Sequence, residues 1–290
     1  MSRAAVAVGS RPLTDAEREA FRTARLVAYH SCPYYAAALF SLIPVAVPGL
    51  GTFAVDRFFR IYMSPELLVG DDSWDPTTAG AVLLHEIGHV LRAHAARAES
   101  LPQPFHHTAW NIAGDAEIND DLLDAGVPLP EGCVTPQALG CLPNGMAETY
   151  YAHVLATRPP QQDQNAPQGG SDSGQGDGSS GDSPQGGGSD QKPRQSAQPQ
   201  QAQAGAGSGG SALDDLLADD GPGCGSGAGT APVPGELPAA QEIDGRAGVD
   251  ETTGGLIRRR VAEAVREEAA KGRGSVPAGM TRWADEILAP

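Results

Sequence analysis

A long stretch without aromatic residues limits how much of this 290-residue chain can form a packed core. Between Pro159 and Asp250 there is no Phe, Tyr or Trp, and long tracts consist of Gly, Ser, Gln, Pro and Asp. Such a segment cannot bury enough apolar surface to offset the entropy lost on ordering. We therefore expect a folded domain over residues 1–158, a disordered linker over 159–250 and a helical tail over 251–290. The tail is too short to fold alone, so it should dock on the first domain or lead into a further one.

The charge and the apolar pattern restrict the partners and the location of the protein. A net charge of −16 argues against nucleic acid or an anionic membrane as the main partner, because both require clustered Lys and Arg. Residues 1–12 lack the apolar core of a signal peptide. The apolar run at residues 36–50 is too short to span a membrane and contains two prolines. The sequence therefore predicts a cytoplasmic protein.

The four cysteines are too few and too scattered for a disulfide scaffold, and none forms a C-x-x-C pair. Free thiols are therefore the expected state. Cys133 and Cys141 could instead pair or share a metal ion.

The residue pattern indicates a mainly helical α+β domain with a short β-hairpin or sheet. Thr14 and Glu17 should form a capping box that begins a helix ending near His30. The segment from Thr52 to Met63 is rich in Phe, Val, Ile and Tyr, which suits two short strands in a hairpin. Further helices are expected at about residues 76–97, 109–124, 146–157 and 256–271.

The helix expected at residues 76–97 carries the sequence His85-Glu86-Ile87-Gly88-His89. Residues four apart lie on one face of an α-helix, so His85 and His89 can direct two imidazole nitrogens at one point. Zinc needs this spacing, and Glu86 beside that point can take a proton from a metal-activated water. Two histidines on an ordinary amphipathic helix are the alternative, but this helix is mostly apolar and would bury them without partners.

A catalytic zinc site takes a third protein ligand and leaves the fourth position to water. Asp115 is the favoured candidate, because Asn111, Asp115 and Asn119 share one stripe of the next expected helix. Asn119 could hydrogen-bond a ligand histidine or Asp115 and so orient it. A solvated helix face would explain the same residues. His106 and His107, in the loop before that helix, are weaker ligand candidates.

Two other polar residues should point away from this site. His94 lies about 140° from His89 around a continuous helix, and Glu117 lies roughly opposite Asp115. The metzincin pattern is absent as well, because residue 95 is alanine where that pattern has its third histidine.

These motifs together resemble a bacterial family of metallopeptidases whose activity is inferred mainly from the H-E-x-x-H motif. The matching segments are L-L-H-E-I-G-H-V-L, W-N-I-A-G-D-A-E-I-N, V-P-L-P-E-G and A-E-T-Y-Y. The resemblance covers about residues 24–155 and returns from Cys224 to Trp283.

The resemblance implies a small zincin-like fold, with helices around a short sheet whose edge strand could hold an extended peptide. It also implies that His85, His89 and Asp115 bind zinc and that Glu86 is the general base. Family members carry a C-terminal von Willebrand factor A-like domain and resemble partners of MoxR-type AAA+ ATPases. This sequence ends where that domain would begin, which leaves open a truncated form and a natural short form.

The favoured function is a zinc-dependent metallopeptidase that acts on proteins or peptides. The alternatives are an adaptor that holds a metal without turnover and recruits an AAA+ ATPase, and a non-proteolytic hydrolase. Tyr150, Tyr151 and His153 could stabilise the transition state, although packing between helices is the commoner role of such residues. Cys224 lies in a Gly-rich loop that could place a thiolate on the zinc and block it, or could be a plain flexible loop.

Overall fold

The structure, a computed structural model, describes residues 9–157, 223–272 and 276–290. Its helices are α1 (Asp15–Ser31), α2 (Ala36–Ser41), α3 (Pro76–Leu91), α4 (His94–Glu99), α5 (His107–Asp124), α6 (Ala147–Thr157), α8 (Glu251–Ala270) and α9 (Ala278–Ile287). Short 3-10 turns occur at η1 (Pro33–Tyr35), η2 (Pro65–Leu67) and η3 (Ser226–Ala228). None of the helices within the described ranges has both the length and the apolar composition that a membrane crossing requires.

The strands β1 (Ile43–Ala46), β2 (Phe53–Val55) and β3 (Arg60–Met63) form a mixed sheet in the order β1-β3-β2. Strand β2 pairs antiparallel with β3, so the expected hairpin is present and the expected α+β class is confirmed. Strand β1 pairs parallel with β3 and is not among the elements expected from the sequence; its four residues include Pro44. Proline is tolerated there because β1 lies at an edge of the sheet.

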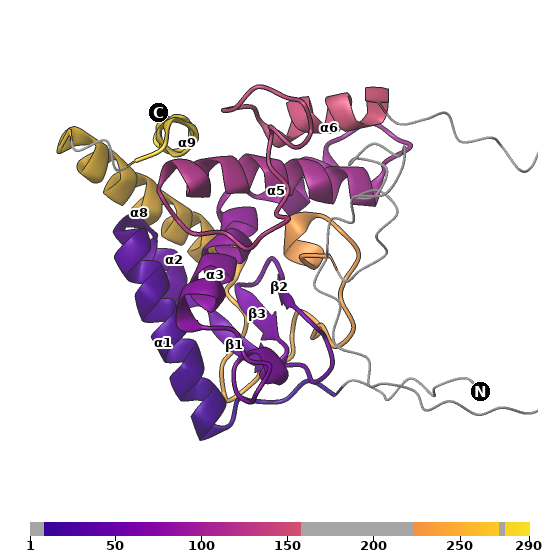
Figure 1. Cartoon of the computed structure of the whole chain (residues 1–290), viewed down its shortest axis with the longest axis vertical. Helices are drawn as coiled ribbons and strands as arrows, with labels where there is room; N and C mark the ends of the chain where they lie inside the picture. The colour runs from indigo at the N-terminus through magenta and orange to yellow at the C-terminus, as the bar shows by residue number, and fades with distance from the viewer. Residues whose placement is uncertain (1–8, 158–222, 273–275) are drawn as a thin grey trace, which may run out of the picture. The chain divides into compact units, whose positions relative to one another are not determined.

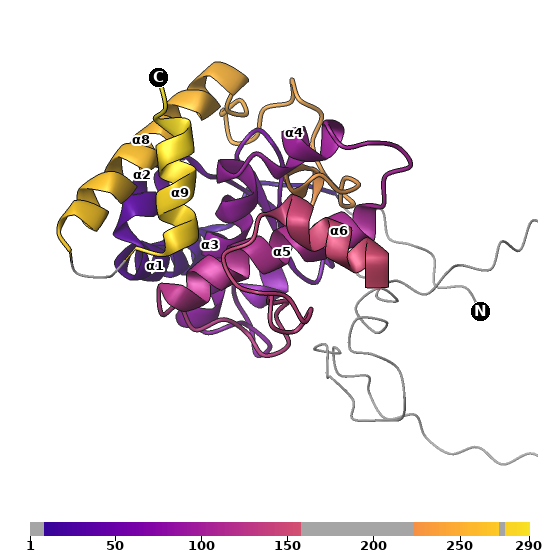
Figure 2. The same cartoon turned by 90° about the horizontal axis from the view of Figure 1, so that it is seen from above.

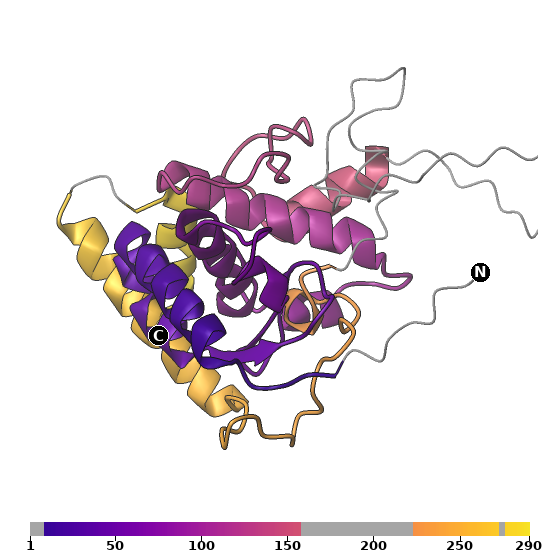
Figure 3. The same cartoon turned by 60° about the horizontal axis from the view of Figure 1, so that its bottom comes forward.

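The two faces of the sheet contact different parts of the chain, because successive side chains of a strand point to opposite faces. Phe53 and Val55 of β2 belong to the large apolar core, to which helices α1, α3 and α8 contribute. Ala54 belongs to a smaller cluster with Val233 and Ile243. The second face is therefore covered by the segment after residue 223, which lies beside the sheet in Figures 1 and 3.

The linker expected from composition extends further along the sequence than the structure supports. Residues 159–222 of the expected linker lie outside the described residues, whereas residues 223–250 pack on the sheet. Arg60 is buried and its guanidinium donates to Asp56 at 2.6 Å and to the backbone oxygen of Leu237 at 2.8 Å. The buried guanidinium of Arg60 thus holds this segment through its backbone carbonyls, and contacts of this kind cannot be predicted from aromatic content.

Helix α3 ends at Leu91 and does not continue through Arg97 as the periodicity indicates. Ala93 has a φ of 52°, in the left-handed region, and α4 begins at His94. This conformation costs a non-glycine residue about 1–2 kcal/mol, so other contacts must compensate for it. The turn brings His94 back against α3.

Helices α8 and α9 pack against each other (Figure 2), and each donates a side-chain hydrogen bond to the end of α3. Arg258 of α8 donates to the carbonyl of Val90 at 3.1 Å, and Trp283 of α9 donates to that of Leu91 at 3.2 Å. The last carbonyls of an α-helix lack partners within the helix, so these bonds stabilise its end. Of the two expectations for the tail, docking is the one that the described residues show.

Candidate metal centre

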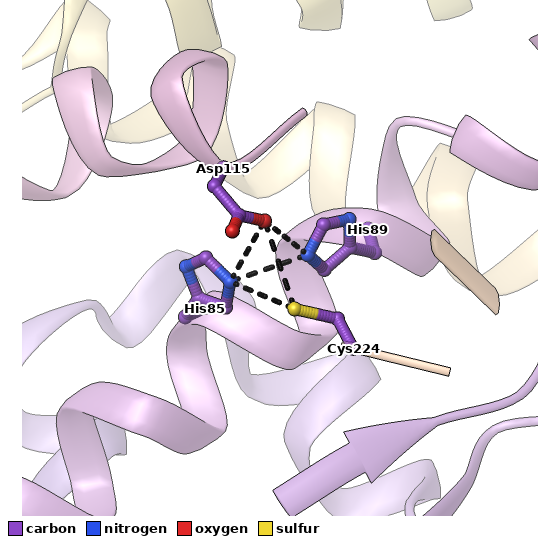
Figure 4. Close-up of side chains that lie close together, drawn as sticks. All are labelled: His85, His89, Asp115 and Cys224. Atoms are coloured by element: carbon purple, nitrogen blue, oxygen red, sulfur yellow. Dashed lines mark hydrogen bonds and ion pairs between the residues drawn. The ribbon is translucent and has the colours of Figure 1, made fainter. Parts of the chain in front are cut away.

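The motif helix α3 places two imidazoles side by side. Its start is fixed by Asp75, whose carboxylate accepts from the backbone N–H groups of Thr77 and Thr78. His85 and His89 then lie one turn apart, and their Nε2 atoms are 3.2 Å from each other (Figure 4). His89 is fully buried, while the side chain of His85 keeps 13% of its surface exposed. The pair is therefore mostly buried, and only part of the His85 side chain reaches solvent.

Helix α5 brings a carboxylate to the same point. The two helices approach closely at Gly88, where an added Cβ would lie 2.8 Å from the side chain of Ile118. Oδ1 of Asp115 lies 3.4 Å from Nε2 of His85 and 3.3 Å from Nε2 of His89. Asp115, chosen from the sequence as the third ligand, is thus where the two histidines converge (Figure 4).

A fourth donor comes from a distant part of the sequence. Sγ of Cys224 lies 3.6 Å from Nε2 of His85 and 3.6 Å from Oδ1 of Asp115. The four donor atoms of His85, His89, Asp115 and Cys224 all lie within 4.8 Å of one another. The sequence indicated this role only as a minor alternative, because no spacing rule links residue 224 to the motif.

The other ring nitrogen of each motif histidine, Nδ1, lies within hydrogen-bond distance of a neighbouring side chain. Nδ1 of His85 lies 2.8 Å from Oδ1 of Asn119, whose Nδ2 donates to the carbonyl of Val134. Nδ1 of His89 lies 2.9 Å from Nδ1 of His94. Both contacts are compatible with a proton on Nδ1 of each motif histidine, and this tautomer would leave the lone pair of each Nε2 for a metal ion.

Two further contacts extend this network. Nε2 of His94 lies 3.3 Å from Oε2 of Glu117, and Asn111 donates to Oδ2 of Asp115 at 3.3 Å. The expectation that His94 points away from His89 is wrong, because the helix breaks at Ala93. An added Cβ at Gly114 would lie 2.8 Å from Nδ1 of His94. His94 can therefore pack against α5 only because residue 114 is a glycine.

Comparison with known proteins assigns the chain to a family. A family model described as "Putative metallopeptidase domain" matches residues 16–290, nearly the whole chain. The chain belongs to this family. No curated protein and no solved structure was found to match. The metallopeptidase-domain family implies a metal ion and peptide substrates, and a donor set of two imidazoles and a carboxylate suits such an ion.

In this member of the metallopeptidase-domain family, burial and charge set the ionisation of the cluster. Burial lowers the pKa of His89 to about 3, which keeps the imidazole neutral. Burial also acts on Asp115, but hydrogen bonds from the two histidines outweigh it and lower its pKa. Burial and the nearby carboxylates of Asp115 and Glu86 raise the pKa of Cys224. His89 and Asp115 are therefore in the forms that bind a metal. Burial also acts on His85, but the hydrogen bond and charge of Asp115 outweigh it and raise the pKa of His85 to about 9, so a metal would displace a proton from this residue.

Glu86 is 2% exposed and lies beside the cluster. Its Oε2 atom is buried and has no hydrogen-bond partner among the described residues. Burial raises its pKa to about 8, although the charge of His85 acts in the opposite direction. A buried carboxyl oxygen without a hydrogen-bond partner is costly for stability, which indicates a role other than packing.

The remaining sequence candidates lie outside the cluster. His106 caps the start of α5 and accepts from the N–H of Ala109, while His107 contacts the carbonyl of Gly229. The hydroxyl of Tyr151 accepts from the N–H of His106, and that of Tyr150 bonds within the loop before α6. His153 contacts the carbonyl of Leu139. Cys133 and Cys141 are free thiols that do not join the four-donor group.

Proposed function

We propose that the protein is a zinc-dependent peptidase in which His85, His89 and Asp115 hold the metal and Glu86 is the general base. The observation that carries the proposal is the convergence of three donor atoms at 3.2–3.4 Å beside the buried carboxyl of Glu86, whose Oε2 has no hydrogen-bond partner among the described residues. A tetrahedral zinc ion with bonds of about 2.0–2.1 Å needs such donors about 3.3 Å apart.

Each residue then has a defined task. A bound zinc ion supplies an activated water near neutral pH and polarises the scissile carbonyl. Glu86 accepts the proton of the attacking water and returns it to the departing amine. Asn119 and His94 fix the rings of His85 and His89, so that both Nε2 lone pairs point at the metal.

The substrate would lie along β2. This strand pairs with β3 on one side only, and β2 also contacts α3, which carries the motif. An extended peptide adds to such an edge through backbone hydrogen bonds, which bind many sequences alike. We therefore expect unfolded or extended polypeptides as substrates.

The test compares metal content and cleavage in two variants of the whole chain. Glu86→Gln keeps the size of the side chain and removes the base, so it should retain zinc by elemental analysis. Cleavage of an unfolded protein substrate should fall by about 10²–10⁴-fold. Glu99→Gln changes an exposed glutamate outside the cluster and should behave as wild type. A fully active Glu86→Gln would show that Glu86 is not the base.

A second candidate function is a metal-holding adaptor without turnover. The sulfur of Cys224 gives the cluster four protein donors, and structural zinc sites are closed in this way. Such a module would recruit a partner, for which the sequence resemblance suggests a MoxR-type AAA+ ATPase. Loss of folding on chelation, together with no cleavage of any tested peptide, would favour this function.

A further inference from the structure

Cys224 lies at the fourth corner of the donor cluster (Figure 4). With bonds of about 2.3 Å to sulfur and about 2.0–2.1 Å to nitrogen or oxygen, a tetrahedral zinc ion requires about 3.6 Å between the sulfur and each other donor. The sulfur is 3.6 Å from His85 and 3.6 Å from Asp115. Two of the three sulfur distances thus match coordination, and the third, to Nε2 of His89, lies within 4.8 Å.

We propose that the thiolate of Cys224 is the fourth metal ligand and closes the centre at rest, and that the segment around it covers the substrate edge of β2. We call residues 223–229 the cysteine segment. The coordination itself requires only a bound metal. The closing of a catalytic centre rests on the peptidase function proposed above.

The cysteine segment follows the free edge of β2. The N–H of Val55 donates to the carbonyl of Cys224 at 2.9 Å, which is the kind of bond that a substrate strand would make. Gly225 has a φ of +87°, in the region that favours glycine. An added Cβ at Gly227 would lie 2.9 Å from the carbonyl oxygen of Val55. Glycine at these positions therefore lets the segment approach the strand.

Polar contacts hold the cysteine segment in this position. Ser226 donates to the carboxylate of Glu236 through its N–H at 2.9 Å and its hydroxyl at 2.6 Å. The indole N–H of Trp110 donates to the carbonyl of Ala228 at 3.0 Å. The thiol is thus positioned by the fold, in contrast to a cysteine on a plain flexible loop.

The same placement explains how the centre would open. A peptide that pairs with β2 must replace the carbonyl of Cys224 as the acceptor for the N–H of Val55. It therefore displaces the cysteine segment from the strand. The thiolate then leaves with its electron pair and one coordination position becomes available. Glu86 lies beside the thiol with an unpartnered Oε2, a costly arrangement that a purely structural site does not need.

The coordination is tested by absorption spectroscopy of the whole protein loaded with Co²⁺. Wild type should show a thiolate-to-cobalt charge-transfer band, and Cys224→Ser should bind cobalt without it. Cys141→Ser is the matched control, because this thiol lies outside the cluster, and it should keep the band. A cobalt-loaded wild type without the band, or a Cys224→Ser variant that keeps it, would overturn the proposal.

Thiol labelling tests the resting state without any change of ligand. Zinc should slow alkylation of Cys224 by at least about tenfold, as followed by peptide mass spectrometry, and leave Cys141 unaffected. Gly227→Ala should push the segment from β2 and restore labelling of Cys224 in the zinc-loaded protein. Gly255→Ala, where an added Cβ meets nothing within 4 Å, is the control. Equal labelling of Cys224 with and without zinc would contradict closure.

Cleavage assays separate this inference from the proposed function. Faster cleavage of an unfolded substrate by Cys224→Ser than by wild type supports both. Loss of the cobalt band without cleavage by either protein supports the coordination and overturns the peptidase. Equal cleavage rates for wild type and Cys224→Ser would contradict closure of the centre by Cys224 and leave the proposed peptidase function intact.

Discussion

At the scale of single residues, the cluster is defined as much by the partners of its members as by the donor atoms. Asn119 hydrogen-bonds to His85, His94 to His89 and Asn111 to Asp115. Hydrogen bonds of this kind fix the orientation of a ligand before the metal binds, and so reduce the cost of binding.

Asn119→Ala removes the acceptor that orients His85. We expect metal affinity to fall by about 10–100-fold, because His85 loses its fixed tautomer and ring orientation. A competition titration with a chromophoric chelator measures this, and the exposed Gln137→Ala is the control. Unchanged affinity would show that His85 binds without this partner.

At the scale of elements, the two helix ends that differ most are those of α1 and α3. Helix α1 begins with the expected capping box, in which Thr14 and Glu17 exchange hydrogen bonds. The end of α3 is different, because the left-handed Ala93 stops the helix and turns His94 inward. The start of α1 follows from a local sequence motif, whereas the end of α3 depends on tertiary contacts.

Glu17→Gln should show how charge stabilises α1. A hydrogen bond from Arg11, with help from Thr14, lowers the pKa of Glu17 to about 2 from an ordinary 4.5. The ionised form is therefore favoured in the folded protein, and its contribution is present above pH 4.5 and lost as the pH falls toward 2.

We expect Glu17→Gln to lower the free energy of unfolding by about 1–2 kcal/mol at pH 7. The difference from wild type should shrink between pH 4.5 and 2, as measured by urea denaturation at several pH values. Glu19→Gln, at an exposed position of the same helix, should change little. A difference that grows on acidification would contradict this account.

At the scale of the whole molecule, contacts between distant parts of the sequence complete both the sheet and the donor cluster. The segment from 223 to 250 covers one face of the sheet and supplies Cys224. Arg60 joins the sheet to this segment through the carbonyls of Leu237 and Pro238. The fold of residues 9–157 is therefore stabilised by residues far along the chain.

Arg60→Ala should be strongly destabilising, because it leaves the buried carboxylate of Asp56 without its cation. We expect a loss of about 3–5 kcal/mol in the free energy of unfolding, measured by chemical denaturation. Arg57→Ala breaks only an exposed pair with Glu99 and should cost less than about 1 kcal/mol. Similar losses in the two variants would show that the Arg60 network contributes little.

The sequence by itself determined the features that depend on local spacing. The capping box of α1, the hairpin of β2 and β3, and the shared face of His85 and His89 all follow from neighbours within a few residues. Asp115 could be selected as a candidate for the same reason, because helical periodicity gives the face on which a residue lies. Its role as a ligand stays a prediction.

Only the tertiary structure decided which distant residues meet. Strand β1, the break at Ala93, and the contacts of His94 and Cys224 with the motif histidines depend on packing between separate elements. Composition assigned Cys224 to a linker because glycine-rich sequence usually lacks the apolar area to fold. Here glycine allows the segment to approach β2 closely, and the buried guanidinium of Arg60 holds it through the carbonyls of Leu237 and Pro238, a contact that composition could not indicate.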